Sequence, residues 1–166
     1  MIKHIYIFLL FSLLIVACDE GLAPLNTPES VTSSFLNGRI HYIGGKSNWP
    51  GKDSVFAIRI VAFKDYPPKD IKTEIITANA LFTVLSLPLN VDSSDFSIEI
   101  PTPPVTYKYI VAAMQYDSTN IMAQKAVGVY AINRDPNSPT TLSIEKGKNY
   151  FIDIYVDFKN LPPQPF

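Results

Sequence analysis

The chain of 166 residues contains one cysteine, one tryptophan and two histidines. A single cysteine excludes the disulfide framework that stabilises many small secreted domains. His4 belongs to an N-terminal apolar segment, so His41 is the histidine of the remaining chain, and we expect no zinc site built from histidine and cysteine. The domain must therefore be stabilised by the burial of apolar side chains.

Excess charge of either sign is also lacking. The sequence has 14 basic and 15 acidic residues, a formal net charge of −1, and no dense cluster of lysine and arginine. This pattern argues against a nucleic-acid partner. No Gly-x-Ser-x-Gly turn offers a nucleophile, and His41, between Ile40 and Tyr42, is typical of a histidine on a strand. We expect no enzyme, no catalytic residue, no metal and no cofactor.

The sequence has no hydrophobic run long enough to cross a bilayer. The longest begins at Ile5 and ends at Ala17, about 13 residues, whereas a membrane helix needs roughly 20. Lys3 supplies a positive charge directly before this run. A short apolar segment after a basic residue is typical of a secretory signal peptide, which we assign to residues 1–17.

The residues at the end of this segment resemble a known processing site. Ile15-Val16-Ala17-Cys18 resembles the lipobox of bacterial lipoproteins. The resemblance implies cleavage before Cys18, a diacylglyceryl thioether on its sulfur and acylation of the new amine. Two or three acyl chains make a stable anchor, so the membrane is an expected partner through lipid on Cys18. The alternative is an ordinary signal peptide or an uncleaved anchor helix, with Cys18 uninvolved.

The acids that follow the cysteine bear on location. An aspartate at position 19 resembles an inner-membrane retention signal of enteric bacteria, whereas acids such as Asp19 and Glu20 resemble export signals of other Gram-negative groups. We expect a lipid-anchored protein of the bacterial cell envelope, at the outer membrane or cell surface in preference to the inner membrane.

Two segments outside the expected domain are rich in proline or small polar residues. Residues 18–34 comprise the lipidated Cys18 and a stretch rich in Pro, Ser, Thr and acids, which predicts a flexible linker. Residues 161–166, Leu-Pro-Pro-Gln-Pro-Phe, favour polyproline II. This tail can dock into a groove of a partner or lie along its own domain, and the sequence leaves both open.

Residues 35–160 have the pattern of an all-β domain, because short apolar runs are separated by Pro- and Gly-rich breaks. Strict alternation in 95–100 and 150–158 predicts strands with one face exposed to water. Residues 54–63 are apolar on both faces apart from Arg59, residues 107–114 are nearly so, and both are expected to be central strands. Further strands are expected at 39–43, 80–85, 126–132 and 141–145, about seven or eight in total, while 71–80 fits a short helix or a strand.

Several short motifs carry a resemblance to a fold family. Asn37-Gly38-Arg39-Ile40, the strand end Ala62-Phe63, residues 95–101 and Thr106-Tyr107 are similar to those of transthyretin-like or carboxypeptidase-regulatory-like modules. The resemblance implies a single antiparallel β-sandwich, and an immunoglobulin-like sandwich fits the periodicity as well. Some transthyretin-like proteins are hydrolases that use several histidines and a C-terminal Tyr-Arg-Gly-Ser, which this chain lacks. The resemblance therefore implies no activity.

Carboxylates are the remaining source of acid and base chemistry. Asp92 and Asp95 could supply two oxygens to calcium, but aspartate is equally typical of turns. Asp153 and Asp157 lie four residues apart on one strand, about 13 Å, which is too far for a glycosidase pair. A carboxylate-dependent hydrolase is kept as an alternative function.

Aromatic residues beside turn formers are the candidate ligand-binding residues: Trp49, Tyr66 and Tyr116. Exposed rings on loops bind flat ligands such as sugars, whereas rings at the end of a sandwich also cap the core. A carbohydrate-binding module is therefore a second alternative. The leading expectation is a non-enzymatic binding or assembly module with an envelope protein or a glycan as its partner.

Overall fold

The computed structural model describes residues 33–165. The predicted signal peptide, Cys18 and the linker as far as residue 32 lie outside the described residues, as does Phe166. The strands are β1 (Ser34–Tyr42), β2 (Ala57–Phe63), β3 (Ala80–Phe82), β4 (Ser93–Ile100), β5 (Val105–Tyr107), β6 (Tyr109–Gln115), β7 (Gln124–Val129), β8 (Leu142–Ile144) and β9 (Asn149–Val156). The helical elements are α2 (Ile71–Ile76) and the short 3₁₀ segments η1 (Gly45–Asn48) and η2 (Lys52–Ser54).

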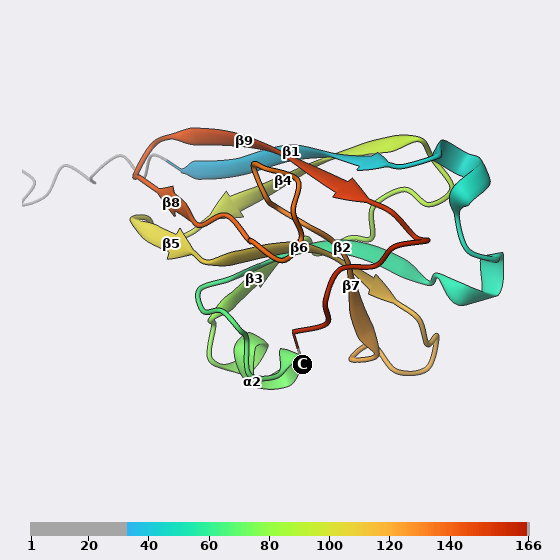
Figure 1. The fold of residues 1–166 in the computed structure, drawn as a ribbon. Helices are drawn as coiled ribbons and strands as arrows, with labels where there is room; N and C mark the ends of the chain where they lie inside the picture. The colour runs from blue at the N-terminus through green and yellow to red at the C-terminus, as the bar shows by residue number, and fades with distance from the viewer. Residues whose placement is uncertain (1–32, 166) are drawn as a thin grey trace, which may run out of the picture. The chain divides into compact units, whose positions relative to one another are not determined.

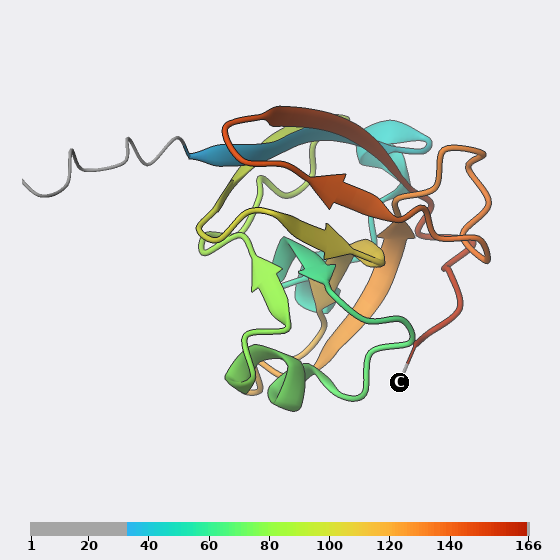
Figure 2. The same cartoon turned by 90° about the vertical axis from the view of Figure 1, so that its left-hand side faces the viewer.

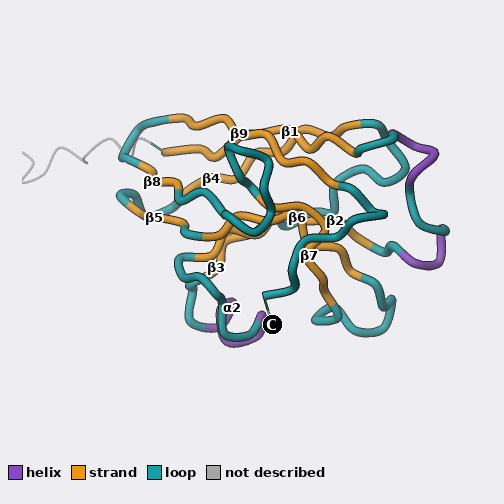
Figure 3. The backbone as a smooth tube through the Cα atoms, in the orientation of Figure 1, coloured by secondary structure: helices purple, strands orange, loops and turns teal. Residues whose placement is uncertain are grey.

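Seven strands form one sheet in the order β3-β2-β6-β7-β9-β1-β4, and β5 pairs with β8 separately. The large sheet folds over so that β4, β1 and β9 face β2 and β6 across the core (Figures 1 and 2). The β5–β8 pair lies at one end of the two layers. Helix α2 and the loop between β6 and β7 project on the side away from β1 (Figure 3).

The expected all-β class is confirmed, but the expected purely antiparallel arrangement is not what the structure shows. Strands β1 and β9 are parallel, from Phe35 opposite Asn149 to Tyr42 opposite Val156, whereas the other pairs are antiparallel. Parallel neighbours require a long crossover connection, and here the rest of the domain provides it. The large sheet is therefore mixed and closes partly into a barrel.

The strand predictions hold where the sequence alternates. On β4, Phe96, Ile98 and Ile100 are buried while the residues between them are exposed. The expected strand over 107–114 is divided at Lys108, because Tyr107 pairs with β8 and Tyr109 pairs with β2. This division gives nine strands in the described chain instead of seven or eight.

The start of the domain differs from the expected boundary at residue 35 by one position. Ser34, assigned above to the linker, is the first residue of β1 and is fully buried. Its hydroxyl donates to the Glu145 carbonyl (2.8 Å) and accepts from the Gly147 N–H (2.8 Å). These bonds connect the first strand to the turn before β9.

The main core lies between the two layers. It contains fully buried aliphatic side chains from both, among them Leu36, Ile40, Ile58, Ile60, Ile110 and Ile154. Burial of one such side chain contributes about 1.5–3 kcal/mol, so this cluster is the main source of stability. Gly38 lies opposite Phe96 on β4, and a Cβ atom at Gly38 would lie 2.5 Å from the Phe96 ring.

Strand β6 is buried at every position, which explains its two-sided apolar sequence. Ile110 and Met114 belong to the main core, whereas Tyr109, Val111 and Ala113 belong to a second apolar cluster. Both β2 and β6 have a neighbouring strand on each side, as expected for central strands. The second cluster requires its own cover, and this cover forms the site described next.

Candidate functional site

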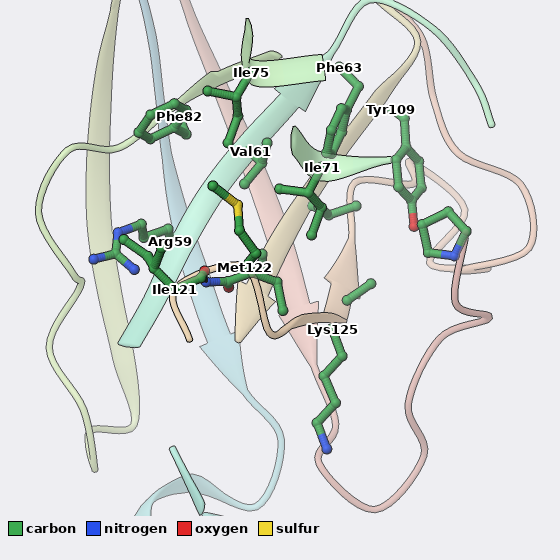
Figure 4. Close-up of a pocket in the computed structure, with 15 residues that line it drawn as sticks. Arg59, Val61, Phe63, Ile71, Ile75, Phe82, Tyr109, Ile121, Met122 and Lys125 are labelled. Carbon is green, nitrogen blue, oxygen red and sulfur yellow. Dashed lines mark hydrogen bonds between the residues drawn. The ribbon is translucent and has the colours of Figure 1, made fainter. Parts of the chain in front are cut away.

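The outer face of β2, β6 and β7 carries an apolar cavity of about 200 Å³, which we call the outer groove (Figure 4). Its floor is the row of side chains that point away from the main core on these strands. The lining residues are Arg59, Val61, Phe63, Ile71, Ile75, Phe82, Tyr109, Val111, Ala113, Ile121, Met122, Gln124, Lys125, Ala126 and Pro165. Almost the whole lining is therefore carbon, and no carboxylate contributes to it.

Helix α2 forms one wall of the outer groove. Ile71 and Ile75 are four residues apart, so they lie on one face of the helix, and both line the cavity. The Asp70 side chain caps the helix by accepting from the Thr73 N–H (2.8 Å). Hydrogen bonding to the Thr73 side chain, followed by that to its backbone, holds the pKa of Asp70 below its usual range. Glu74 is buried on the helix and accepts from the Lys69 N–H (3.0 Å). These bonds cap the short helix and connect it to the residues that precede it.

The loop between β6 and β7 forms a second wall. Ile121 and Met122 line the cavity yet are 60% and 42% exposed. Their backbone is held by the Asn120 side chain, which accepts from the Met122 N–H (3.0 Å). The Asp117 carboxylate accepts from the N–H and hydroxyl of Thr119 (both 2.8 Å), and these bonds lower the pKa of Asp117. Two large apolar side chains thus stand at the mouth on an ordered loop.

The proline-rich tail forms the third wall, so through residue 165 it lies along its own domain. In the described chain β7 pairs with β9 only through Gly128 and Val129. On this side of β7, the residues before Gly128 have no strand beside them. The Gln164 amide occupies this edge: its Oε1 accepts from the Ala126 N–H (2.9 Å) and its Nε2 donates to the Ala126 carbonyl (3.0 Å). This contact places Pro165 at the groove.

Tyr109 closes one end of the outer groove. Its ring is 2% exposed and lies 6.0 Å from the Phe63 ring and 4.9 Å from the Tyr66 ring. Burial, followed by the neighbouring Tyr66, raises the pKa of Tyr109 well above its usual range. The hydroxyl therefore stays neutral at physiological pH, and this end of the groove carries no charge.

Trp49 lies in an aromatic cluster at the end of β1, away from the outer groove. Its ring is 4.5 Å from Tyr42 and 4.9 Å from Phe158, and its Nε1 donates to the Val91 carbonyl (2.9 Å). The ring is half-buried and its polar atom is bonded within the protein. This placement favours the core-capping interpretation of Trp49.

Tyr66 and Tyr116 are 47% and 49% exposed, but the structure does not bring them together with Trp49. Trp49 precedes β2 and Tyr66 follows it, so the length of the strand, about 20 Å, separates them. Tyr66 contacts Tyr109 at the start of β6, whereas Tyr116 follows the end of that strand and lies near Lys125. The three rings do not form a shared platform.

The acids singled out from the sequence take part in different contacts. Asp92 accepts from the Lys46 N–H (2.9 Å), while Asp95 is bound by Arg39 (2.6 and 3.1 Å), whose hydrogen bonds lower the pKa of Asp95. Asp153 on β9 accepts a hydrogen bond from the Nε2 atom of His41 on β1 (2.7 Å). The Arg39–Asp95 and His41–Asp153 pairs are typical of cross-strand contacts on a wet sheet face, whereas Asp92 binds the backbone of η1.

A second cavity of about 230 Å³ lies beside the β7–β9 pair. It is lined in part by Arg134, Tyr155 and Asp157, and the Arg134 guanidinium donates to the Tyr155 hydroxyl (2.9 Å). Asp157 is the single carboxylate among its lining residues. Neither cavity therefore brings two carboxylates together.

The sequence signal for the outer groove was the two-sided apolar character of 54–63 and 107–114, which implied a second buried face. It did not indicate what covers that face. The side chains of Ile71, Ile121 and Gln164 come from a helix, a loop and the tail, and no local pattern connects them.

Comparisons with protein-family models, with curated proteins and with solved structures find no match for this chain. Across residues 33–165, no helix has the length and apolar character needed to cross a bilayer. Over the same range, no group of three or more His, Cys, Asp or Glu side chains is placed to hold a metal ion.

Proposed function

We propose that this protein is a lipid-anchored component of the bacterial cell envelope that binds an apolar ligand in the outer groove without transforming it. The proposal includes lipidation of Cys18, a location at the outer membrane or cell surface, and a likeness of the two strand layers to transthyretin-like or immunoglobulin-like sandwiches. The observation that carries the binding function is the apolar cavity on the outer face of β2, β6 and β7.

Three features support a binding site over an ordinary gap in packing. The cavity holds about 200 Å³, against about 30 Å³ for one water-sized group, so a segment of several atoms fits. Ile121 and Met122 keep large exposed apolar surfaces at its mouth. Ligand sites in proteins are concave and mostly apolar with a few polar groups at defined places, and the outer groove has this character.

The first test uses a neutral fluorescent probe, N-phenyl-1-naphthylamine, with the full chain carrying Cys18→Ser. We expect its emission to rise on binding, and Ala113→Leu, which places a larger side chain on the groove floor, to remove most of the rise. Phe151→Ala is the matched control, because Phe151 is 65% exposed on β9 and does not line the groove. The proposal would be contradicted if both variants lost the rise in probe emission equally, or if the emission did not rise with the unaltered groove.

The anchor is tested separately in cells. Palmitate labelling and membrane fractionation of the native chain should both be positive, and Cys18→Ser should abolish both, because a stable anchor requires the acyl chains. A Cys18→Ser protein that stays labelled and membrane-bound would refute the lipobox interpretation.

A further inference from the structure

The charged residues of the outer groove share one sign and one end. Among the lining residues Arg59 and Lys125 carry the charge, and both are cationic. Arg59 on β2 lies opposite Ala113 on β6, which lies opposite Ala126 on β7, the neighbour of Lys125. Lys125 itself pairs with Met114, the residue after Ala113, so the two cations lie in adjacent rows at the same end of the groove.

The other end of the groove is uncharged. Phe63 lies four residues beyond Arg59 on β2 and pairs with Tyr109, about 13 Å along the strand. Between these ends the floor is formed by Val61 and Val111. The outer groove therefore has an apolar length that ends at a cationic rim.

Neither cation has an acidic partner among the residues that the structure describes. In the part of the chain that the structure describes, Arg59 contacts the Gln115 amide oxygen (3.4 Å), and the Lys125 Nζ lies 5.7 Å from the Tyr116 ring centre. No acidic side chain in residues 33–165 forms an ion pair with either of them. Figure 4 shows the charged ends of Arg59 and Lys125 directed away from the apolar interior. The positive charge lies where a ligand would enter, and among the described residues no acidic side chain pairs with it.

We propose that the ligand is a free, single-chain anionic amphiphile, such as an alkanoate, whose chain lies in the outer groove and whose acid group lies at the rim formed by Arg59 and Lys125. This inference rests on the proposed function and names its ligand class. A cavity of about 200 Å³ has room for part of one alkyl chain. Charge complementarity at the rim selects an anionic head over a neutral or cationic one.

The experiment measures binding of dodecanoate, dodecanol and dodecyltrimethylammonium, each below its aggregation concentration, to the full chain carrying Cys18→Ser by isothermal titration calorimetry. We expect dodecanoate to bind about tenfold more tightly than dodecanol, because two rim cations each contribute a modest charge interaction. The trimethylammonium compound should bind most weakly. Equal affinity for the three compounds would overturn the anionic class while leaving the proposed apolar site standing, whereas no binding of any compound would overturn both.

Variants locate the two parts of the ligand. Arg59→Gln combined with Lys125→Gln should weaken dodecanoate about tenfold and change dodecanol by less than about twofold. The matched control combines Arg39→Gln with Lys159→Gln, which removes the same charges at residues that do not line the groove. An equal effect of both pairs would overturn the assignment of the head group.

The position of the ligand's alkyl chain is tested at the groove mouth. Ala113→Leu should abolish dodecanoate binding, and Met122→Glu, at a 42% exposed position of the groove mouth, should weaken it at least tenfold through charge repulsion. If Met122→Glu keeps its affinity for dodecanoate, the proposed position of the alkyl chain is refuted. Binding to anionic phosphatidylglycerol vesicles without binding to monomeric dodecanoate would also overturn the proposal, since the face would then recognise a membrane surface.

Discussion

The Gln164 side chain is predicted to hold the C-terminal tail on the domain. Its amide makes two hydrogen bonds to the Ala126 backbone (2.9 and 3.0 Å) and one to the Pro162 carbonyl (2.8 Å). A hydrogen bond contributes about 0.5–1.5 kcal/mol net, so the Ala126 pair contributes about 1–3 kcal/mol. Release of the Gln164 backbone alone regains about 1 kcal/mol of conformational entropy, which offsets part of this loss. We therefore expect Gln164→Ala to lower the free energy of unfolding by about 1 kcal/mol.

The assay for this prediction is amide hydrogen exchange together with urea denaturation. In Gln164→Ala the Ala126 amide should exchange faster than in the native chain, because its acceptor is lost, whereas amides within the β1–β4 ladder should be unchanged. Gln164→Glu should be at least as disruptive, because a carboxylate oxygen would face the Ala126 and Pro162 carbonyls. Pro163→Ala, at an exposed position of the same tail, is the control. Unchanged exchange at Ala126 in Gln164→Ala would refute the reasoning.

Three further predictions concern the fold. Gly38→Ala should destabilise by about 1–3 kcal/mol in urea, since its Cβ would lie 2.5 Å from the Phe96 ring, and an unchanged midpoint would contradict this contact. Trp49→Ala should cost about 3 kcal/mol in the same assay by removing the ring that packs on Phe158, and a loss below about 1 kcal/mol would point to an exposed role. Burial raises the pKa of Tyr109. The contribution of its neutral hydroxyl to the free energy of unfolding is therefore fully present below about pH 10 and is lost as the pH rises further. When the pH is raised from neutral to above about 10, the free energy of unfolding should fall less in Tyr109→Phe than in the native chain. An identical pH dependence in the two proteins would refute the assignment of this loss to Tyr109.

Local patterns predicted much of the strand content because burial on one face leaves a period of two. The alternation around Phe96 and Ile154 gave β4 and β9, and the two-sided runs gave β2 and β6 as interior strands. The parallel pairing of β1 with β9 joins segments more than a hundred residues apart, and no short-range pattern specifies it. The division at Lys108 depends on which partner strand each side finds, which is also a tertiary effect.

The outer groove was only half predictable. The apolar outer positions of β2 and β6, such as Val61 and Val111, required a cover. The segment 71–80 fitted a helix or a strand. The Asp70 cap, together with the placement of Ile71 and Ile75 in the wall of the outer groove, favours the helix. Gln164 had no signal, because its role depends on an unpaired edge that exists only in the folded sheet.

The position of an alkyl chain in the outer groove is the central claim, and paramagnetic relaxation tests it most directly. A doxyl-labelled dodecanoate would be added to the methyl-labelled chain carrying Cys18→Ser, and methyl signals would be compared by NMR. The account predicts selective broadening at Ile71, Ile75 and Val111, which line the groove, and none at Ile132, which is 76% exposed and does not line it. Broadening at Ile132 equal to that at the groove residues, or no broadening at the groove, would contradict the account.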